Sequence, residues 1–374
     1  MKPLIPIRFY QLNSSRIGHF VLNPEIYLCE KEFFNKKGLD IFCYQKEICN
    51  NFLAELFKRK LIIFPRQIIE PIIIINNFLI KYFSYFKNHK IHITCPDRDV
   101  NNLFDKFEAN FKFSDEENSR GLEYLKSKGL NKNSKFVILY VRDSKYLEIK
   151  YPKQNWGYHD YRNFNIEDFI PAAEELTRRG FFVFRMGSIV EKKIQSKNKM
   201  IIDYASSNER SDFLDIFLCA KCNFCLSTSS GFDGIPQIFR RPVASIFVPF
   251  YLIYSWSSNQ LVMTKHHFSI SKKRNLKLSE LLKIDQKKLL FTSEYEKNDI
   301  KLIPNSPDEI LEFANEAVSI FTLNDKSSVN EKNQKIFWSL FDKLIKIQNL
   351  NNYHGKYKAI ISESFLKTNP EWLQ

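Results

Sequence analysis

Short apolar runs alternate with amphipathic stretches along most of the chain. In the first third, the apolar runs Ile5 to Leu12, Leu39 to Tyr44, Leu61 to Phe64 and Ile91 to Thr94 predict four strands. The stretches between them place apolar residues at helical spacing. Because strands that alternate with helices indicate βαβ units, we expect a parallel sheet covered by helices.

A helix is predicted from Ser114 to Gly129, because Ser114 and Glu117 have the spacing of a capping box and Gly129 can end a helix. A second alternation of strands and helices follows it. Further strands are predicted at Lys135 to Val141, Phe181 to Arg185, Phe224 to Leu226 and Val243 to Val248. Further helices are predicted at Ile166 to Arg179, Asp212 to Ala220, Phe232 to Phe239 and Pro307 to Ile320. We therefore predict an α/β protein with a first domain over 1–130, a second over 131–325 and helices over 326–374.

The most apolar segment runs from Ile68 to Ile80. It is too short to span a membrane, and Glu70, Pro71 and two asparagines interrupt it. We predict a core helix or a buried strand here. With no transmembrane helix and no signal peptide evident, we expect a cytoplasmic protein.

Length and charge narrow the function classes. The chain of 374 residues can form two domains, and its formal net charge is +14. Such a charge favours anionic partners: nucleotides, nucleic acid or an anionic membrane surface. The basic residues are scattered, however, and form no long Lys/Arg block or known nucleic-acid-binding pattern. We expect most of them to lie on a solvated surface.

The seven cysteines include the run Cys219, Cys222 and Cys225, which resembles part of an iron–sulfur pattern. Cys219 ends a predicted helix and Cys225 lies in a predicted strand, so their sulfur atoms should point in different directions. We predict buried structural thiols and no metal site. The fingerprints GxGxxG and GxxxxGKS/T do not occur, which removes the common dinucleotide and P-loop interpretations.

A hydroxyl-rich loop follows the predicted strand Phe224 to Leu226 and precedes a helix. Such a loop gathers backbone N–H groups and hydroxyls around one small volume, which suits a phosphate or a carboxylate. The alternative is an ordinary helix N-cap in a serine-rich turn. The residues concerned are Ser227, Thr228, Ser229, Ser230 and Gly231.

Two further strand ends carry polar residues. Arg142 follows one strand, and Arg185 and Gly187 end the next. The carboxyl ends of parallel strands line one crevice, so two arginines and the hydroxyl-rich loop predict a diphosphate site. Glu309, in the first turn of a helix, could accept hydrogen bonds from ribose hydroxyls; the alternative is a carboxylate that complements the helix dipole.

A candidate general base lies in the first strand–helix loop. His19 follows Gly18 there, and histidine titrates near the operating pH of most enzymes. The alternative is a capping or core histidine. Asp160 is the second candidate; His159 is its neighbour, so the two are not expected to address the same atom.

Several segments in order resemble a family of bacterial glycosyltransferases that is found among surface-polysaccharide and lipopolysaccharide biosynthesis genes. The resemblance covers roughly residues 134–374; in the first 130 residues it depends mainly on Arg16 to His19 and on the general architecture. The matching segments are Tyr140 to Asp143, His159 to Asn163, Arg185 to Gly187, Ser227 to Gly231 and, in the tail, Ile361 to Glu371.

The resemblance implies a GT-B fold, in which two Rossmann-like domains face each other across a cleft. The second domain would bind a nucleotide-activated sugar as substrate, with no cofactor, and the first would receive a glycan or lipid-linked acceptor. Terminal helices would pack back toward the N-terminal domain. We expect acceptor-side roles for Arg16, Gly18, His159 and Arg162, a metal-independent transfer, no nucleic-acid partner, and peripheral association with the inner face of the bacterial inner membrane.

Three alternatives remain at this stage. The same cleft could serve another nucleotide-dependent transferase, such as one that moves a pyruvyl or phospho-sugar group. The charge and aromatic content permit a basic nucleic-acid-binding protein, although aromatic and basic residues are not interleaved on a predicted strand face. The chain could also be an inactive scaffold that retains the fold.

Overall fold

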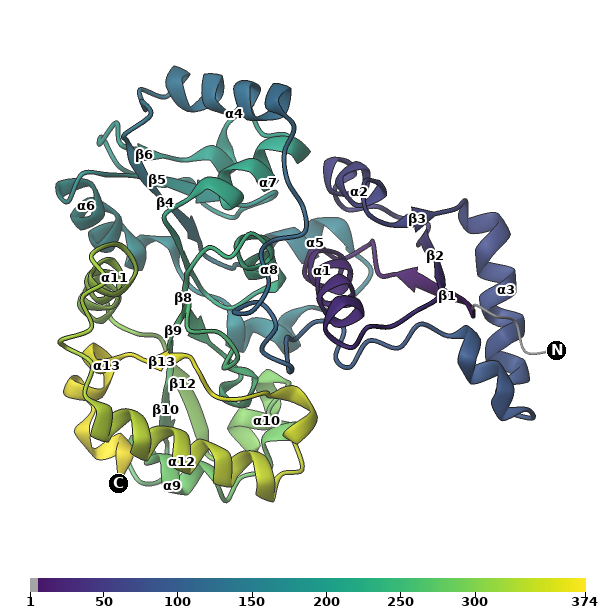
Figure 1. The fold of residues 1–374 in the computed structure, drawn as a ribbon. Helices are drawn as coiled ribbons and strands as arrows, with labels where there is room; N and C mark the ends of the chain where they lie inside the picture. The colour runs from purple at the N-terminus through teal and green to yellow at the C-terminus, as the bar shows by residue number, and fades with distance from the viewer. Residues whose placement is uncertain (1–5) are drawn as a thin grey trace.

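The computed structural model describes residues 6–374, which form two parallel sheets with helices around them (Figure 1). The smaller sheet has the order β1-β2-β3, and all its strand pairs are parallel. Ile5, the first residue of the predicted first strand, lies outside the described residues. The strands and their connecting helices are β1 (Ile7–Leu12), α1 (Ile17–Phe33), β2 (Leu39–Tyr44), α2 (Asn51–Lys58) and β3 (Ile62–Ile63).

The predicted fourth strand, Ile91 to Thr94, does not form. Lys90 makes a single parallel bridge with Phe9, and the Ile91 N–H donates to the Phe9 carbonyl at 3.2 Å. The Thr94 N–H donates instead to the Glu30 carboxylate of α1. The segment therefore starts beside β1, but by Thr94 its backbone bonds to a side chain of α1 and not to the sheet.

The larger sheet is entirely parallel and has the order β13-β9-β8-β7-β4-β5-β6. Strand order runs outward in opposite directions from β4 and β7, so the topological switch point lies between these two strands. The strands are β4 (Lys135–Tyr140), β5 (Phe181–Met186), β6 (Ile201–Ile202), β7 (Phe224–Ser227), β8 (Val243–Phe247), β9 (Gln260–Thr264) and β13 (Ile360–Ile361).

The predicted helices around the larger sheet form, and the α/β class is confirmed. Ser114 caps its helix with Glu117 in a capping box, and Ser306 and Glu309 do the same. The helices are α4 (Asp115–Ser127), α5 (Lys145–Lys150), α6 (Ile170–Arg178), α7 (Asp212–Lys221), α8 (Gly234–Ile238), α11 (Pro307–Thr322), α12 (Glu331–Ile347) and α13 (Glu363–Thr368).

A small antiparallel sheet was not predicted from the sequence. Its order is β11-β10-β12, and both of its strand pairs are antiparallel. Two short helices accompany it. The elements are β10 (His266–Ser269), β11 (Arg274–Asn275), α9 (Leu278–Leu281), α10 (Thr292–Lys297) and β12 (Ile300–Ile303).

Helix α4 ends just before the predicted domain boundary at residue 130 and contacts both domains. Helix α4 packs on α7 of the larger domain (Figure 1). A Cβ added at Gly121 would lie 2.2 Å from the Phe217 ring. Tyr124 and Lys128 also contact Glu209. Glu117 of α4 also accepts from Arg59 of α2 in the first domain at 2.6 Å, and the boundary at residue 130 stays a prediction.

The tail packs mainly on the larger sheet, which corrects the expected return to the N-terminal domain. Phe337 and Phe341 of α12 join the apolar core of the larger domain, and β13 pairs with β9. The physical reason is that the tail completes the edge of the sheet. Residues 353–358 of the tail contact the linker, which we define as residues 95–113: Arg98 donates to the Tyr353 carbonyl at 2.7 Å.

The apolar segment Ile68 to Ile80 is helical but is not a core helix. It forms α3 (Arg66–Leu79), followed by the 3-10 helix η1 (Ser84–His89). Only Ile69 and Asn76 of α3 are buried. One side of α3 packs on β1 and β2, and the three-stranded sheet leaves the other side uncovered at the outer edge of the molecule (Figure 1). Among residues 6–374, no helix has the length and apolar character that a bilayer crossing requires.

The cysteines agree with the thiol prediction. All seven are free; Cys219, Cys222 and Cys225 are buried, and burial raises the pKa of each thiol. Within residues 6–374, no three His, Cys, Asp or Glu side chains are grouped as metal ligands.

We expect Gly121→Ala to destabilise the protein by about 1–3 kcal/mol, because the added Cβ forces α4 away from the Phe217 ring. The same change in an exposed helix would instead stabilise by about 1 kcal/mol. The measurement is denaturant unfolding, with the exposed neighbour change Ser119→Ala as control. A more stable G121A variant would contradict the packing of α4 on α7.

Candidate functional site

A pocket of about 460 Å³ lies between the two domains, at the carboxyl ends of β4 and β7. This is the switch point of the larger sheet, where ligands bind in open α/β folds. The second domain contributes Arg142, Arg162 and the segment from Ser229 to Phe232. The first domain contributes the N-terminal turn of α1, with Arg16, Ile17, Gly18 and His19.

The hydroxyl-rich loop is held in a tight shape at the floor of the pocket. Ser229 has φ +49°, in the left-handed region that non-glycine residues seldom adopt. Its N–H donates to Ser245 Oγ at 3.2 Å, and its carbonyl accepts from Arg162 at 3.0 Å. Ser230 caps η5 (Gly231–Asp233) by accepting from the Phe232 N–H at 3.0 Å. The loop is therefore both a helix cap and a pocket wall.

Asp233 fixes this loop from beneath. Its carboxylate is fully buried and accepts hydrogen bonds from the Ser227 and Ser245 hydroxyls and from the Ser230 N–H. Burial raises the pKa of Asp233 to about 6, although the hydrogen bond from Ser227 opposes this shift. The sequence analysis missed Asp233, and its position three residues after Ser230, as in a capping box, was the available signal.

The two domains touch through two glycines. A Cβ added at Gly18 would lie 2.5 Å from Gly231 Cα, and one added at Gly231 would lie 2.8 Å from Gly18 Cα. Neither glycine has a positive φ, so the requirement is for space and not for conformation. The first turn of α1 therefore lies directly against the hydroxyl-rich loop.

The first turn of α1 has no capping side chain and lines the pocket. Its N-cap residue, Arg16, makes no side-chain capping bond, and the first turn carries no acidic residue. Uncapped N–H groups at a helix N-terminus favour an anion, as does the helix dipole. A second anion-favouring element thus lines the pocket next to the loop.

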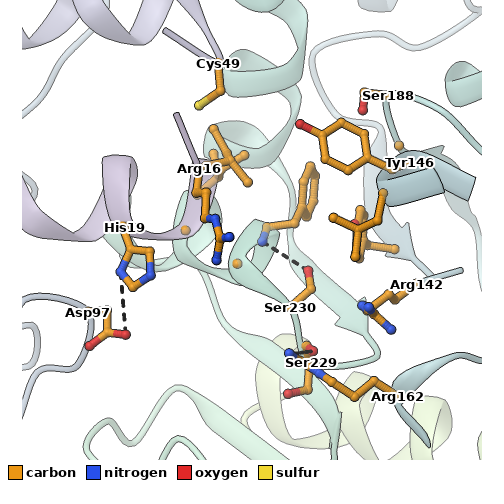
Figure 2. Close-up of a pocket in the computed structure, with 18 of the residues that line it drawn as sticks. Arg16, His19, Cys49, Asp97, Arg142, Tyr146, Arg162, Ser188, Ser229 and Ser230 are labelled. Atoms are coloured by element: carbon orange, nitrogen blue, oxygen red, sulfur yellow. Dashed lines mark hydrogen bonds and ion pairs between the residues drawn. The ribbon is translucent and has the colours of Figure 1, made fainter. Parts of the chain in front are cut away.

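Three arginines surround this volume without a carboxylate partner among the described residues. Figure 2 shows Arg16 entering from the α1 side and Arg142 and Arg162 from the other side, with Ser229 and Ser230 between them. Arg142 donates to Asn163 Oδ1 and its backbone N–H donates to Thr228 Oγ1 at 2.8 Å. Burial, followed by the charge of Arg162, lowers the pKa of Arg142 to about 10.

The positive charge of the arginines also affects the pKa of His159. Burial, followed by the charges of Arg162 and Arg142, lowers the pKa of His159 to about 4. His159 is therefore neutral at pH 7, and its Nδ1 has no hydrogen-bond partner among the described residues. A neutral His159 can donate or accept one hydrogen bond but is a weak base.

His19 lies at the opposite rim and faces Asp97. Its Nδ1 is 3.6 Å from Asp97 Oδ2, and both side chains line the pocket (Figure 2). A carboxylate at Nδ1 favours the tautomer that leaves Nε2 free to accept a proton. Sequence reasoning found His19 but missed Asp97, because nothing in the Pro96–Asp97–Arg98 run indicates that the linker returns to α1.

Several predicted residues do not reach the pocket. Arg185 is buried and pairs with Asp203 at 3.0 Å. Glu309 caps its own helix and pairs with His266 at 2.9 Å. Asp160 is exposed and accepts from Asn163 at 2.9 Å. Gly187 does line the pocket, and Ser227 and Thr228 support it from below.

Comparison with known proteins yields weak similarities only. No protein-family model matches the sequence, and no curated protein matches it. The crystal structure of a glycosyl transferase family 9 protein from Veillonella parvula is 13% identical with a TM-score of 0.49, covering 84% of this chain and 98% of that chain. The E. coli ADP-heptose LPS heptosyltransferase II is 10% identical with a TM-score of 0.43, covering 83% and 98%. Because identity and TM-score are both low, function is inferred here from this chain's own pocket.

We expect Gly18→Ala to separate α1 from the hydroxyl-rich loop and to destabilise the protein by about 1–3 kcal/mol. Gly157→Ala is the matched control, because a Cβ there meets only the Asn155 and Asp160 side chains, at 3.2 and 3.6 Å. Thermal unfolding of both variants checks the expectation. Equal stability of the two would contradict the close approach of the two glycines.

Proposed function

We propose that the chain is a glycosyltransferase that moves a sugar from a nucleotide-activated donor to a glycan or lipid-linked acceptor. The observation that carries the proposal is the convergence of Arg16, Arg142 and Arg162 on one pocket at the switch point of a parallel sheet. Unpaired guanidinium groups near a hydroxyl-rich loop favour a ligand with several negative oxygens. A nucleoside diphosphate has this chemistry.

In the proposed complex, the donor diphosphate lies in the pocket beside the contact of Gly18 with Gly231, where the hydroxyl-rich loop and the first turn of α1 both line the cavity. Arg142 and Arg162 contact its oxygens from the second domain, and Arg16 contacts them from the first. As the bond between the sugar carbon and the phosphate oxygen breaks, negative charge develops on the departing diphosphate. Guanidinium and backbone N–H groups that are already oriented stabilise this charge, in the role that a metal ion has in other transferases.

His19 is the proposed general base. Its Nε2 takes the proton of the acceptor hydroxyl while the hydroxyl oxygen bonds to the anomeric carbon, and Asp97 stabilises the imidazolium that forms. The products are the new glycoside, the nucleoside diphosphate and a proton that His19 later releases. Attack from the side opposite the leaving group makes this an inverting transfer. Asp160 is not among the residues that line the pocket and accepts a hydrogen bond from Asn163, so it is the weaker candidate.

The acceptor would approach from the first domain, where His19 and Asp97 line the rim. The net charge of +14 suits an acceptor that carries acidic groups or lies at an anionic membrane surface. A role in surface-glycan synthesis accords with both, and with the motif series noted in the sequence.

We expect a nucleoside diphosphate to protect the protein against thermal unfolding. At a ligand concentration of about a hundred times Kd, binding stabilises by about 2.7 kcal/mol. A panel of three nucleoside diphosphates, UDP, GDP and ADP, together with the monophosphate CMP, identifies the nucleotide. Arg142→Ala and Arg162→Ala should each weaken binding by at least about tenfold, because each removes a charged phosphate contact.

The matched control is Arg178→Ala, since Arg178 is an exposed arginine on α6 that pairs with Glu175 far from the pocket. It should bind the nucleotide as the wild type does. If none of the four nucleotides protects the protein and RNA gives a salt-sensitive gel shift with it, the interpretation as a nucleic-acid-binding protein is favoured over the transferase. Nucleotide binding without turnover of any donor would favour the scaffold.

We expect His19→Gln to reduce kcat by about a hundredfold to ten-thousandfold with little change in nucleotide affinity, because the base acts on the acceptor and not on the donor. Asp97→Asn should reduce kcat less, since it removes only the charge that orients and stabilises His19. Steady-state kinetics with the donor found in the nucleotide panel measure both. A normal kcat in the H19Q variant would remove His19 as the base.

A further inference from the structure

The outer side of α3 is the largest run of exposed apolar side chains on the first domain. Ile68, Ile72, Ile74, Ile75 and Phe78 are between 38% and 62% exposed. The opposite side of the same helix packs on the sheet through Ile69 and Asn76. A helix side that carries this many apolar side chains is normally covered, and here the outer side of α3 has no cover among residues 6–374.

Aromatic residues continue this surface beyond the end of α3. Tyr82, Phe83 and Tyr85 are 66%, 58% and 45% exposed and lie in or beside η1. Tyrosine and phenylalanine at the border of an apolar surface are typical of segments that lie at the boundary between lipid chains and headgroups. We define the α3 face as these three residues together with the five exposed apolar residues of α3.

The charges around the α3 face are basic. Residues 66–94 contain four Lys or Arg and a single acidic residue, Glu70, which already pairs with Arg66 at 2.7 Å. Lys81, Lys87 and Lys90 are exposed and form no ion pair among the described residues. An apolar surface bordered by unpaired lysines complements a membrane whose headgroups are anionic.

We propose that the α3 face docks the protein on an anionic lipid surface, with α3 lying in the plane of the interface. The helix has 14 residues, too few to cross a bilayer but enough to lie along one. A second copy of the chain fits less well: a symmetric contact would bring two sets of unpaired lysines together with no free carboxylate between them. In Figure 1, α3 lies on the side of the first domain that faces away from the second domain, so docking leaves the pocket free.

The test is co-sedimentation with vesicles of phosphatidylcholine alone, and of phosphatidylcholine and phosphatidylglycerol in equal parts. Wild-type protein should bind the anionic vesicles more tightly, and added salt should weaken this binding. The triple variant Ile74→Ser, Ile75→Ser and Phe78→Ser should bind at least about tenfold more weakly, because it loses the apolar contact. Replacing Lys81, Lys87 and Lys90 by Gln should lower affinity for anionic vesicles by about fivefold per lysine and leave neutral vesicles unaffected.

The matched control is Leu122→Ser, Leu323→Ser and Ile347→Ser, which removes three side chains that are 55%, 62% and 64% exposed elsewhere on the molecule. It should bind vesicles as the wild type does. An unchanged unfolding temperature in each variant shows that the fold is intact.

Equal binding by the α3 variant and the wild type, or no binding to either vesicle, would overturn the proposal. A dimer in sedimentation that the α3 variant abolishes would assign the α3 face to a second copy of the chain. Because no readout uses the nucleotide, the transfer reaction and membrane docking can fail separately.

Discussion

The close approach of Gly18 and Gly231 determines the geometry of the pocket. It sets the N-terminal turn of α1 against the hydroxyl-rich loop, so donors from two domains face one volume. Any side chain at either position would widen this gap. Around the contact, Arg240 of the second domain pairs with buried Glu25 of α1 at 2.6 Å, and Asn50 donates to the Asp212 carbonyl at 2.9 Å. The approach is thus supported on both sides by charged and polar contacts.

The loop itself is shaped by a negative charge that is hidden from the pocket. Asp233 faces Ser227, Ser245 and the Ser230 N–H beneath the loop, and its carboxylate is fully buried. The arginines above the loop therefore remain available to a ligand, since the hydroxyls and not the guanidinium groups satisfy this carboxylate. Lys265 has a similar supporting position: it donates to the Tyr161 and Asn163 carbonyls at 3.0 and 2.7 Å, and burial lowers its pKa to about 7.

The strand ends and the hydroxyl-rich loop could be predicted because apolar periodicity marks where each strand stops. Arg142 and Ser229 therefore lie where the pattern indicates. Arg185 could not be placed in this way: successive residues of a strand point to opposite faces, and Asp203 captures its guanidinium. Asp97 was missed because a linker's path depends on tertiary contacts. The prediction that Ile68 to Ile80 is buried was wrong, because an apolar run does not indicate whether another element covers it.

The contacts between the domains argue for a pocket that is formed before the ligand arrives. Arg98, almost fully buried, donates to the carbonyls of Leu252, Ile253 and Tyr353 at 2.7–3.0 Å, and Asn102 donates to the carbonyls of Trp256 and Lys356. A wide hinge motion would break these bonds and leave a buried guanidinium unsatisfied, at a cost of several kcal/mol in total. Preformed donors need no reorganisation when charge develops on a leaving group. The bonds of the linker thus hold the two domains in place, so that the arginines of the pocket are already oriented toward a leaving group.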